Sequence, residues 1–126
     1  LDTTKFVVYG LFNDYDDRYW DLPPTNEVFN RSLQALINRL SGTSILLILP
    51  AENLSPSCFT GHGGVSKERV VNFNEIAHSM KSDLVETLCL DSMISPKDKD
   101  AIDDARHYPR DVWRKVGFFT QEWVSN

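Results

Sequence analysis

The segment Ser44–Leu49 limits what this chain can fold into more than any other part of its sequence. It reads SILLIL and Pro50 ends it, so the run carries almost no polar side chain. A strand with one face in water alternates polar and apolar residues, whereas a strand covered on both faces, as in a parallel sheet, does not. The sequence therefore predicts a buried strand in a parallel sheet.

Two other apolar runs have the character of strands, and three segments have the spacing of helices. Residues 5–12 read KFVVYGLF and residues 84–90 read LVETLCL, both too short for a helix. The helical segments repeat apolar residues along one face. These positions are Phe29, Leu33, Leu36, Ile37 and Leu40 in the first, Val70, Phe73, Ala77 and Met80 in the second, and Val112, Val116, Phe119 and Trp123 in the third.

Capping residues mark the ends of these helices. Thr25 and Ser66 stand where a side-chain oxygen can accept a hydrogen bond from an amide of the first turn. Gly42 can supply the positive φ that ends the first helix, and Pro109 suits the first turn of the last one. Residues 51–65 are expected to form a long loop.

The order of elements is strand, helix, strand, helix, strand, helix. Helical connections of this length call for right-handed parallel crossovers. We therefore predict a single α/β domain over residues 1–126, or the carboxyl-terminal part of one, built as a three-layer αβα sandwich around a parallel sheet. Three strands would leave the first with an open apolar edge, which two strands upstream of Leu1 would cover.

Charge and hydropathy exclude two classes of partner. The chain has 13 Lys and Arg against 18 Asp and Glu, a net charge of −5, and it has no basic stripe for a phosphate backbone. Nucleic acid is therefore not expected. The longest apolar run, residues 45–49, is far shorter than the roughly 20 residues of a membrane span. The sequence leaves the cellular compartment open.

The cysteines and histidines do not predict a metal site. Cys58 and Cys89 are too few for a disulfide framework, and whether they pair is left open. Cys89 lies in an apolar run and is interpreted as a small core residue. His62 could join His107 and Cys58 around a metal, but these spacings match no zinc pattern.

Two short patterns lie where a parallel sheet collects its functional groups, beyond the carboxyl ends of strands. The first is Gly10-Leu11-Phe12-Asn13-Asp14, whose amide groups could donate hydrogen bonds to an oxyanion. The second is Asp103-Asp104-Ala105-Arg106-His107, in which an Asp three residues before a His can orient the imidazole. Taken singly, each pattern also fits an ordinary surface turn.

Together, in this order, the two patterns resemble the SGNH (GDSL-type) hydrolases. VVYGLFND is similar to that family's G-x-N-D block, and DDARHYP to its D-x-x-H block before the last helix. The resemblance implies a flavodoxin-like fold, an ester substrate such as an acetylated carbohydrate, and no cofactor. It further implies that Asn13 donates to the oxyanion, His107 is the general base and Asp104 orients it, with Gly10 at the substrate.

The sequence departs from this family in two respects. Gly10 and Asn13 are separated by two residues where the family has one, and no Gly-Asp-Ser block supplies a nucleophile. The chain therefore resembles the carboxyl-terminal portion of such an enzyme, with the serine on a missing N-terminal segment, on a second chain, or lost. We expect the loop of residues 13–21 to form the main wall of the substrate site through the rings of Tyr15, Tyr19 and Trp20.

A binding module is the alternative function. The helix and strand FNRSLQALINRLSG–TSILLIL faintly resemble the core of barstar-like nuclease inhibitors. Residues 14–21 are rich in acidic and aromatic side chains, which could mimic phosphates before a basic active site, and the net charge of −5 agrees with such a role. The DDARHYP segment favours the esterase, because an inhibitor has no need of it.

Overall fold

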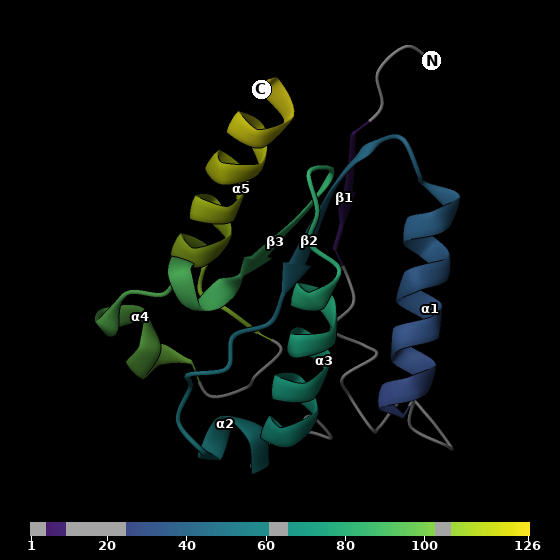
Figure 1. Ribbon diagram of the computed structural model, residues 1–126. Helices are drawn as coiled ribbons and strands as arrows, with labels where there is room; N and C mark the ends of the chain where they lie inside the picture. The colour runs from purple at the N-terminus through teal and green to yellow at the C-terminus, as the bar shows by residue number, and fades with distance from the viewer. Residues whose placement is uncertain (1–4, 10–24, 61–65, 103–106) are drawn as a thin grey trace.

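The computed structural model describes residues 5–9, 25–60, 66–102 and 107–126. Within them a three-stranded parallel sheet forms the centre of the fold, in the order β1 (Lys5–Val8), β2 (Ser44–Leu49), β3 (Val85–Cys89) (Figure 1). The central strand is the SILLIL run, and residues 45–49 are all buried. The buried parallel strand predicted from this run is confirmed.

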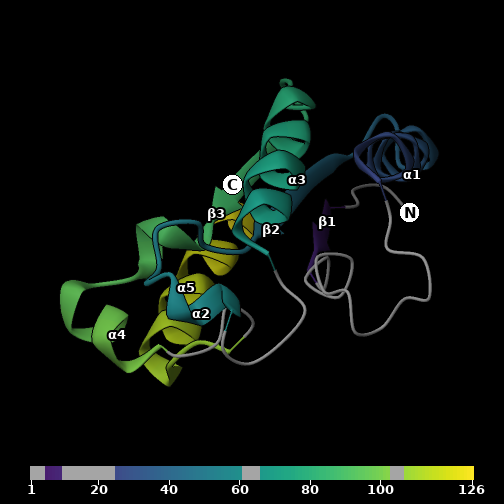
Figure 2. The same ribbon diagram turned by 90° about the horizontal axis from the view of Figure 1, so that it is seen from below.

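Helices cover both faces of the sheet. The long helices α1 (Asn26–Arg39) and α3 (Lys67–Ser79) lie side by side on one face, and α5 (Arg110–Ser125) lies on the other (Figures 1 and 2). The rings of Phe29 and Phe73 stack 4.1 Å apart and join α1 to α3. The mixed α/β architecture with a parallel sheet, as expected from the sequence, is thus present.

The register of the sheet shows which side chains meet which helix. Thr87 hydrogen-bonds to His78 of α3, so alternate residues of β3 from Val85 face that helix. The intervening positions, which include Leu88, face α5. Leu46 of β2 pairs with Glu86, and Ile48 of β2 pairs with Leu88. Leu46 and Ile48 therefore also lie on the α5 face. Leu46, Ile48 and Leu88 are all buried there.

The predicted caps of α1 and α3 are confirmed. Thr25 Oγ1 accepts a hydrogen bond from Val28 N at 3.2 Å, and Ser66 Oγ accepts one from Arg69 N at 3.1 Å. Gly42 has φ +85 just past the end of α1. Pro109 lies one residue earlier than predicted, at the N-cap of α5 instead of inside its first turn.

Three short elements were not predicted. The helix α2 (Ser57–Thr60) lies within the expected loop of residues 51–65, and the 3₁₀-helix η3 (Leu90–Met93) follows β3 directly. The helix α4 (Pro96–Ala101) begins with a cap in which Ser95 Oγ accepts a hydrogen bond from Asp98 N. All three are too short for an apolar repeat to reveal them.

A lysine joins the first strand to the end of the last helix. Lys5 Nζ donates hydrogen bonds to the carbonyl oxygens of Trp123 and Val124, at 3.1 and 3.0 Å. The last turn of α5 contains no basic residue, so the cation that complements the negative end of the helix dipole comes from β1. This contact ties together residues 118 positions apart in the sequence.

Two glycines should respond oppositely to the same substitution. Neither Gly42 nor Gly117 would place a new Cβ within 4 Å of an atom beyond its own local backbone and chain neighbours, so backbone preference decides the effect. Gly42→Ala should lower the free energy of unfolding by roughly 1 to 2 kcal/mol, because φ +85 disfavours an L side chain. Gly117→Ala, in the middle of α5, should raise it by about 1 kcal/mol. Urea unfolding of both variants measures this, and two shifts of the same sign would contradict it.

No helix in the described part of the chain combines the length and the apolar character that a bilayer crossing requires.

Candidate functional site

The carboxyl ends of the three parallel strands meet at one edge of the sheet. Tyr9 follows β1, Pro50 and Ala51 follow β2, and η3 follows β3. The loop after β2 is held at this edge by side chains from later in the chain. Three successive amides of that loop, those of Ala51, Glu52 and Asn53, each donate a hydrogen bond to a side-chain oxygen.

The partners of the three amides come from two segments. Asp91 in η3 accepts from Glu52 N at 2.8 Å through Oδ2 and from Asn53 N at 2.9 Å through Oδ1. Tyr108, just before α5, accepts from Ala51 N at 3.1 Å through its hydroxyl oxygen. These amides are therefore engaged within the protein and do not act as an oxyanion hole.

His107 lies at the same edge, because its neighbour Tyr108 is anchored there. The His107 side chain is exposed, whereas Tyr108 is buried. The ring of Trp113, in the first turns of α5, meets the ring of Tyr108 edge to face at 5.7 Å and that of Tyr9 at 5.7 Å. This row of three rings connects the end of β1 to the start of α5.

The other residues assigned to the esterase site, and one loop histidine, lie outside the described part of the chain. These are the proposed catalytic partners Asn13 and Asp104, the substrate contacts Gly10, Tyr15, Tyr19 and Trp20, and the loop residue His62. The meeting of Asn13 with His107 in one crevice, and the wall of aromatic rings, therefore remain predictions.

A buried asparagine organises a second group of polar side chains at this edge. Asn74 of α3 is fully buried, and its Nδ2 donates to Pro50 O and to Glu52 Oε2, both at 3.0 Å. The apolar repeat of α3 could have identified this residue from the sequence. Asn74 falls on the same helix face as Val70, Phe73 and Ala77, so it is a polar side chain in a buried stripe.

Cys89 belongs to this polar group, so its interpretation as a simple core residue was incomplete. The thiol is half-buried, 3.3 Å from Pro50 O and 3.1 Å from Asp91 Oδ2. Burial, with the nearby carboxylates of Asp91 and Glu52, raises the pKa of Cys89 from 9.0 to about 12. Cys89 is therefore a protonated thiol at neutral pH and not a nucleophile.

Cys58 and the acidic side chains do not form a metal centre in the described residues. Cys58 is buried, and its thiol donates to Ile102 O at 3.2 Å, which joins α2 to the end of α4. Among residues 5–9, 25–60, 66–102 and 107–126, no three His, Cys, Asp or Glu side chains gather closely enough to hold a metal ion.

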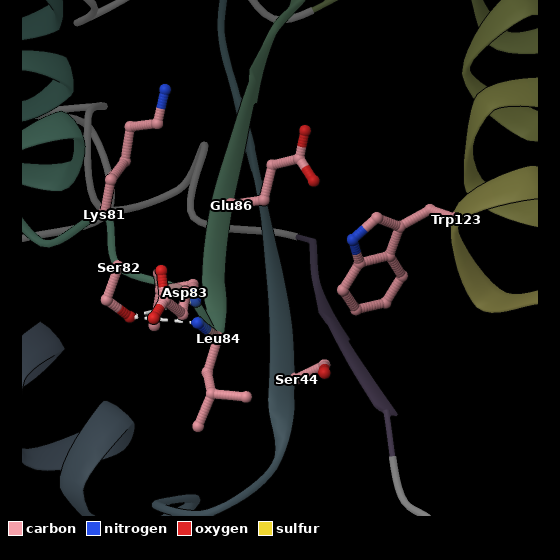
Figure 3. A pocket seen from close by; sticks show the side chains of 8 residues that line it. Ser44, Lys81, Ser82, Asp83, Leu84, Glu86 and Trp123 are labelled. Atoms are coloured by element: carbon pink, nitrogen blue, oxygen red, sulfur yellow. Dashed lines mark hydrogen bonds between the residues drawn. The ribbon is translucent and has the colours of Figure 1, made fainter. Parts of the chain in front are cut away.

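A hollow of about 210 Å³ opens at the opposite edge of the sheet, where β2 and β3 begin (Figure 3). Ser44, Glu86 and Trp123 line it from the α5 face, and the turn of residues 81–84 completes it. His107, the candidate catalytic residue within the described part of the chain, does not line this hollow. The candidate site is therefore the carboxyl edge, where His107 lies.

Searches for related proteins identify no family: no family model, no curated protein and no solved structure matches the chain.

Proposed function

We propose that this chain is the carboxyl-terminal part of an SGNH-type ester hydrolase or O-acyltransferase with a flavodoxin-like, three-layer fold. The observation that carries the proposal is the position of His107. It is exposed, it ends a D-x-x-H segment immediately before the last helix, and its neighbour Tyr108 is bonded to the loop that leaves β2. A general base needs this combination of an open side chain and a fixed backbone.

The arrangement of the elements supports the same proposal. The three strands are parallel and ordered β1-β2-β3, with helices on both faces of the sheet. In such sheets, ligands bind beyond the carboxyl ends of the strands. Asn13 follows β1 in the sequence and the Asp104–His107 pair follows β3, so the proposal assigns both patterns to loops that leave that edge.

Each of the named residues has one role in the proposed reaction. His107 takes the proton of a serine hydroxyl as the serine attacks the ester carbonyl, and later gives it to the leaving alcohol. Asp104 accepts the imidazole Nδ1–H and stabilises the imidazolium, while the side-chain amide of Asn13 donates to the oxyanion. Water, or an acceptor hydroxyl in a transferase, then releases the acyl group from the serine.

The nucleophile is the part that this sequence does not supply. It contains no Gly-Asp-Ser block, so the proposal requires a serine from residues outside these 126 or from a second chain. The substrate is an acyl ester, such as an acetylated carbohydrate, with Gly10 and the rings of Tyr15, Tyr19 and Trp20 as its contacts. Aromatic rings suit this task because their faces stack on sugars while their polar atoms stay in water.

The proposal is tested by replacing His107 in the natural polypeptide that carries this sequence. His107→Asn should lower the hydrolysis of p-nitrophenyl acetate by about 10⁴-fold or more, because the serine loses its base. His78→Asn is the matched control: His78 is also exposed, but it lies on α3 and bonds to Thr87. Turnover that is equal in wild type and His107→Asn would refute the esterase.

The alternative function predicted from the sequence is a barstar-like nuclease inhibitor. The acidic and aromatic residues that suggested it, 14–21, lie outside the described part of the chain.

A further inference from the structure

We infer that Tyr108 is a positioning residue for His107 in the reaction proposed above: its hydroxyl fixes the backbone of the general base against the end of β2. The inference rests on the proposed function, because it assigns a second residue to the same site. Tyr108 does not touch the reacting atoms in this scheme. It acts through the placement of His107.

The hydroxyl of Tyr108 accepts a hydrogen bond from a buried backbone amide. The side chain of Ala51 is fully buried, and its amide donates to Tyr108 Oη at 3.1 Å. Water cannot reach a buried backbone amide to replace a lost acceptor. The hydrogen bond between this amide and Tyr108 is therefore held firmly. The tyrosine is itself only 8% exposed. The contact bridges 57 residues of sequence and joins the end of β2 to the segment before α5.

The ring of Tyr108 is held independently of its hydroxyl. Trp113 packs against it edge to face, with the ring planes at 89° and the centroids 5.7 Å apart. The next residue, Pro109, has φ −59 and ψ 158, and its carbonyl accepts from Val112 N at 3.0 Å at the start of α5. A residue before proline is confined to extended backbone conformations. Tyr108 is therefore fixed at its hydroxyl, at its ring and in its backbone.

This fixation matters because His107 is the adjoining residue. Its own side chain is exposed. His107 forms a β-bridge of its own, and the anchored Tyr108 fixes the adjoining position of the chain at the strand ends. Catalysis by a general base is sensitive to displacements of about 1 Å, which can lower a rate by about 10²-fold. Loss of the Tyr108 anchor should therefore reduce the chemical step and leave substrate binding largely intact.

The experiment measures kcat and KM separately for Tyr108→Phe in the natural polypeptide. Phenylalanine keeps the ring and its contact with Trp113 but leaves the amide of Ala51 without its acceptor. We expect kcat to fall by about 10- to 100-fold with KM changed less than about threefold. The imidazole signals of His107 in NMR spectra should also broaden or shift, which reports its placement without turnover.

Ser82→Ala is the matched control. Ser82 Oγ accepts from Leu84 N and Val85 N, so this variant also removes a hydroxyl acceptor from backbone amides, but at the amino edge of the sheet. It should lower the unfolding temperature and leave kcat and the His107 signals as in wild type. If Tyr108→Phe does not fold, Trp113→Leu replaces it, because this change removes the ring contact and keeps the hydroxyl; kcat should then fall several-fold.

The failures of the two proposals are distinguishable. An enzyme that His107→Asn inactivates, but whose folded Tyr108→Phe variant has the wild-type kcat and unchanged His107 signals, would overturn the positioning role alone. A fall of kcat in Ser82→Ala as large as that in Tyr108→Phe would also overturn it, since general loss of stability would then explain both. A wild-type polypeptide without ester turnover would overturn the proposed function and this inference with it.

Discussion

Asp104→Asn should lower ester turnover by about 10⁴-fold, whereas Asp103→Asn should leave most of it. The carboxylate of Asp104 is proposed to hold the Nδ1–H of His107, which keeps Nε2 free to accept the serine proton. An asparagine of the same shape can present its NH₂ group instead and select the wrong tautomer, and this change in a Ser-His-Asp triad costs about 10⁴ in turnover. The family spacing of three residues favours Asp104 over its neighbour.

The measurement is steady-state hydrolysis of a generic acetyl ester by the natural polypeptide and its two variants. Asp103→Asn is a close control, because it removes the same charge one position away in the sequence. Equal activity of wild type and Asp104→Asn would eliminate the triad. A large loss in Asp103→Asn alone would move the orienting role by one residue and contradict the assignment made from the resemblance.

The second large effect is expected at Cys89, which should react with iodoacetamide about 10²-fold more slowly in the native protein than after unfolding. A pKa of about 12 instead of 9.0 lowers the thiolate population at pH 8 by about 10³-fold. A more basic thiolate is also more nucleophilic, which raises the reaction rate again by roughly one order of magnitude. Mass spectrometry of the peptide that contains Cys89, with and without urea, measures the ratio. Equal rates would show an exposed thiol with an ordinary pKa.

The same pKa shift predicts a loss of stability in alkali. The folded protein keeps the proton of Cys89 at pH values where the unfolded chain has released it. The contribution to stability is therefore fully present below pH 9.0 and is lost as the pH rises through about 12. Cys89→Ser lacks this titration, so its free energy of unfolding should fall less over that interval. An identical pH dependence in both proteins would contradict the shift.

Local patterns predicted the elements of this fold well, because each depends on residues close together in the sequence. The apolar run of β2 predicts a strand covered on both faces, and Thr25 and Ser66 each cap a helix by bonding an amide three residues ahead. Pro109 was misplaced by one position, since both the N-cap and the first turn tolerate a residue without an N–H.

Local sequence patterns could not predict the contacts that build the candidate site. Asp91 bonds to amides 38 and 39 residues away, and Tyr108 to one 57 residues away, so no spacing in the sequence announces either pair. No pattern in the sequence singled out Tyr108 or Trp113 as a site residue. His107 was identified because an Asp lies three residues before it, and Asn74 was recognisable only as a polar residue within an apolar stripe.

The position of α5 has a consequence for synthesis of the protein. In the described part of the chain, α5 covers the sheet face that carries Leu46, Ile48 and Leu88, and Lys5 of β1 bonds to its last turn. A ribosome releases all three strands before it releases this helix, so that face meets water while translation continues. Exposed apolar sheet surface of this kind attracts other nascent chains. A polypeptide stalled before Arg110 would therefore be a substrate for chaperones and proteases, although the three described strands of its sheet are already made.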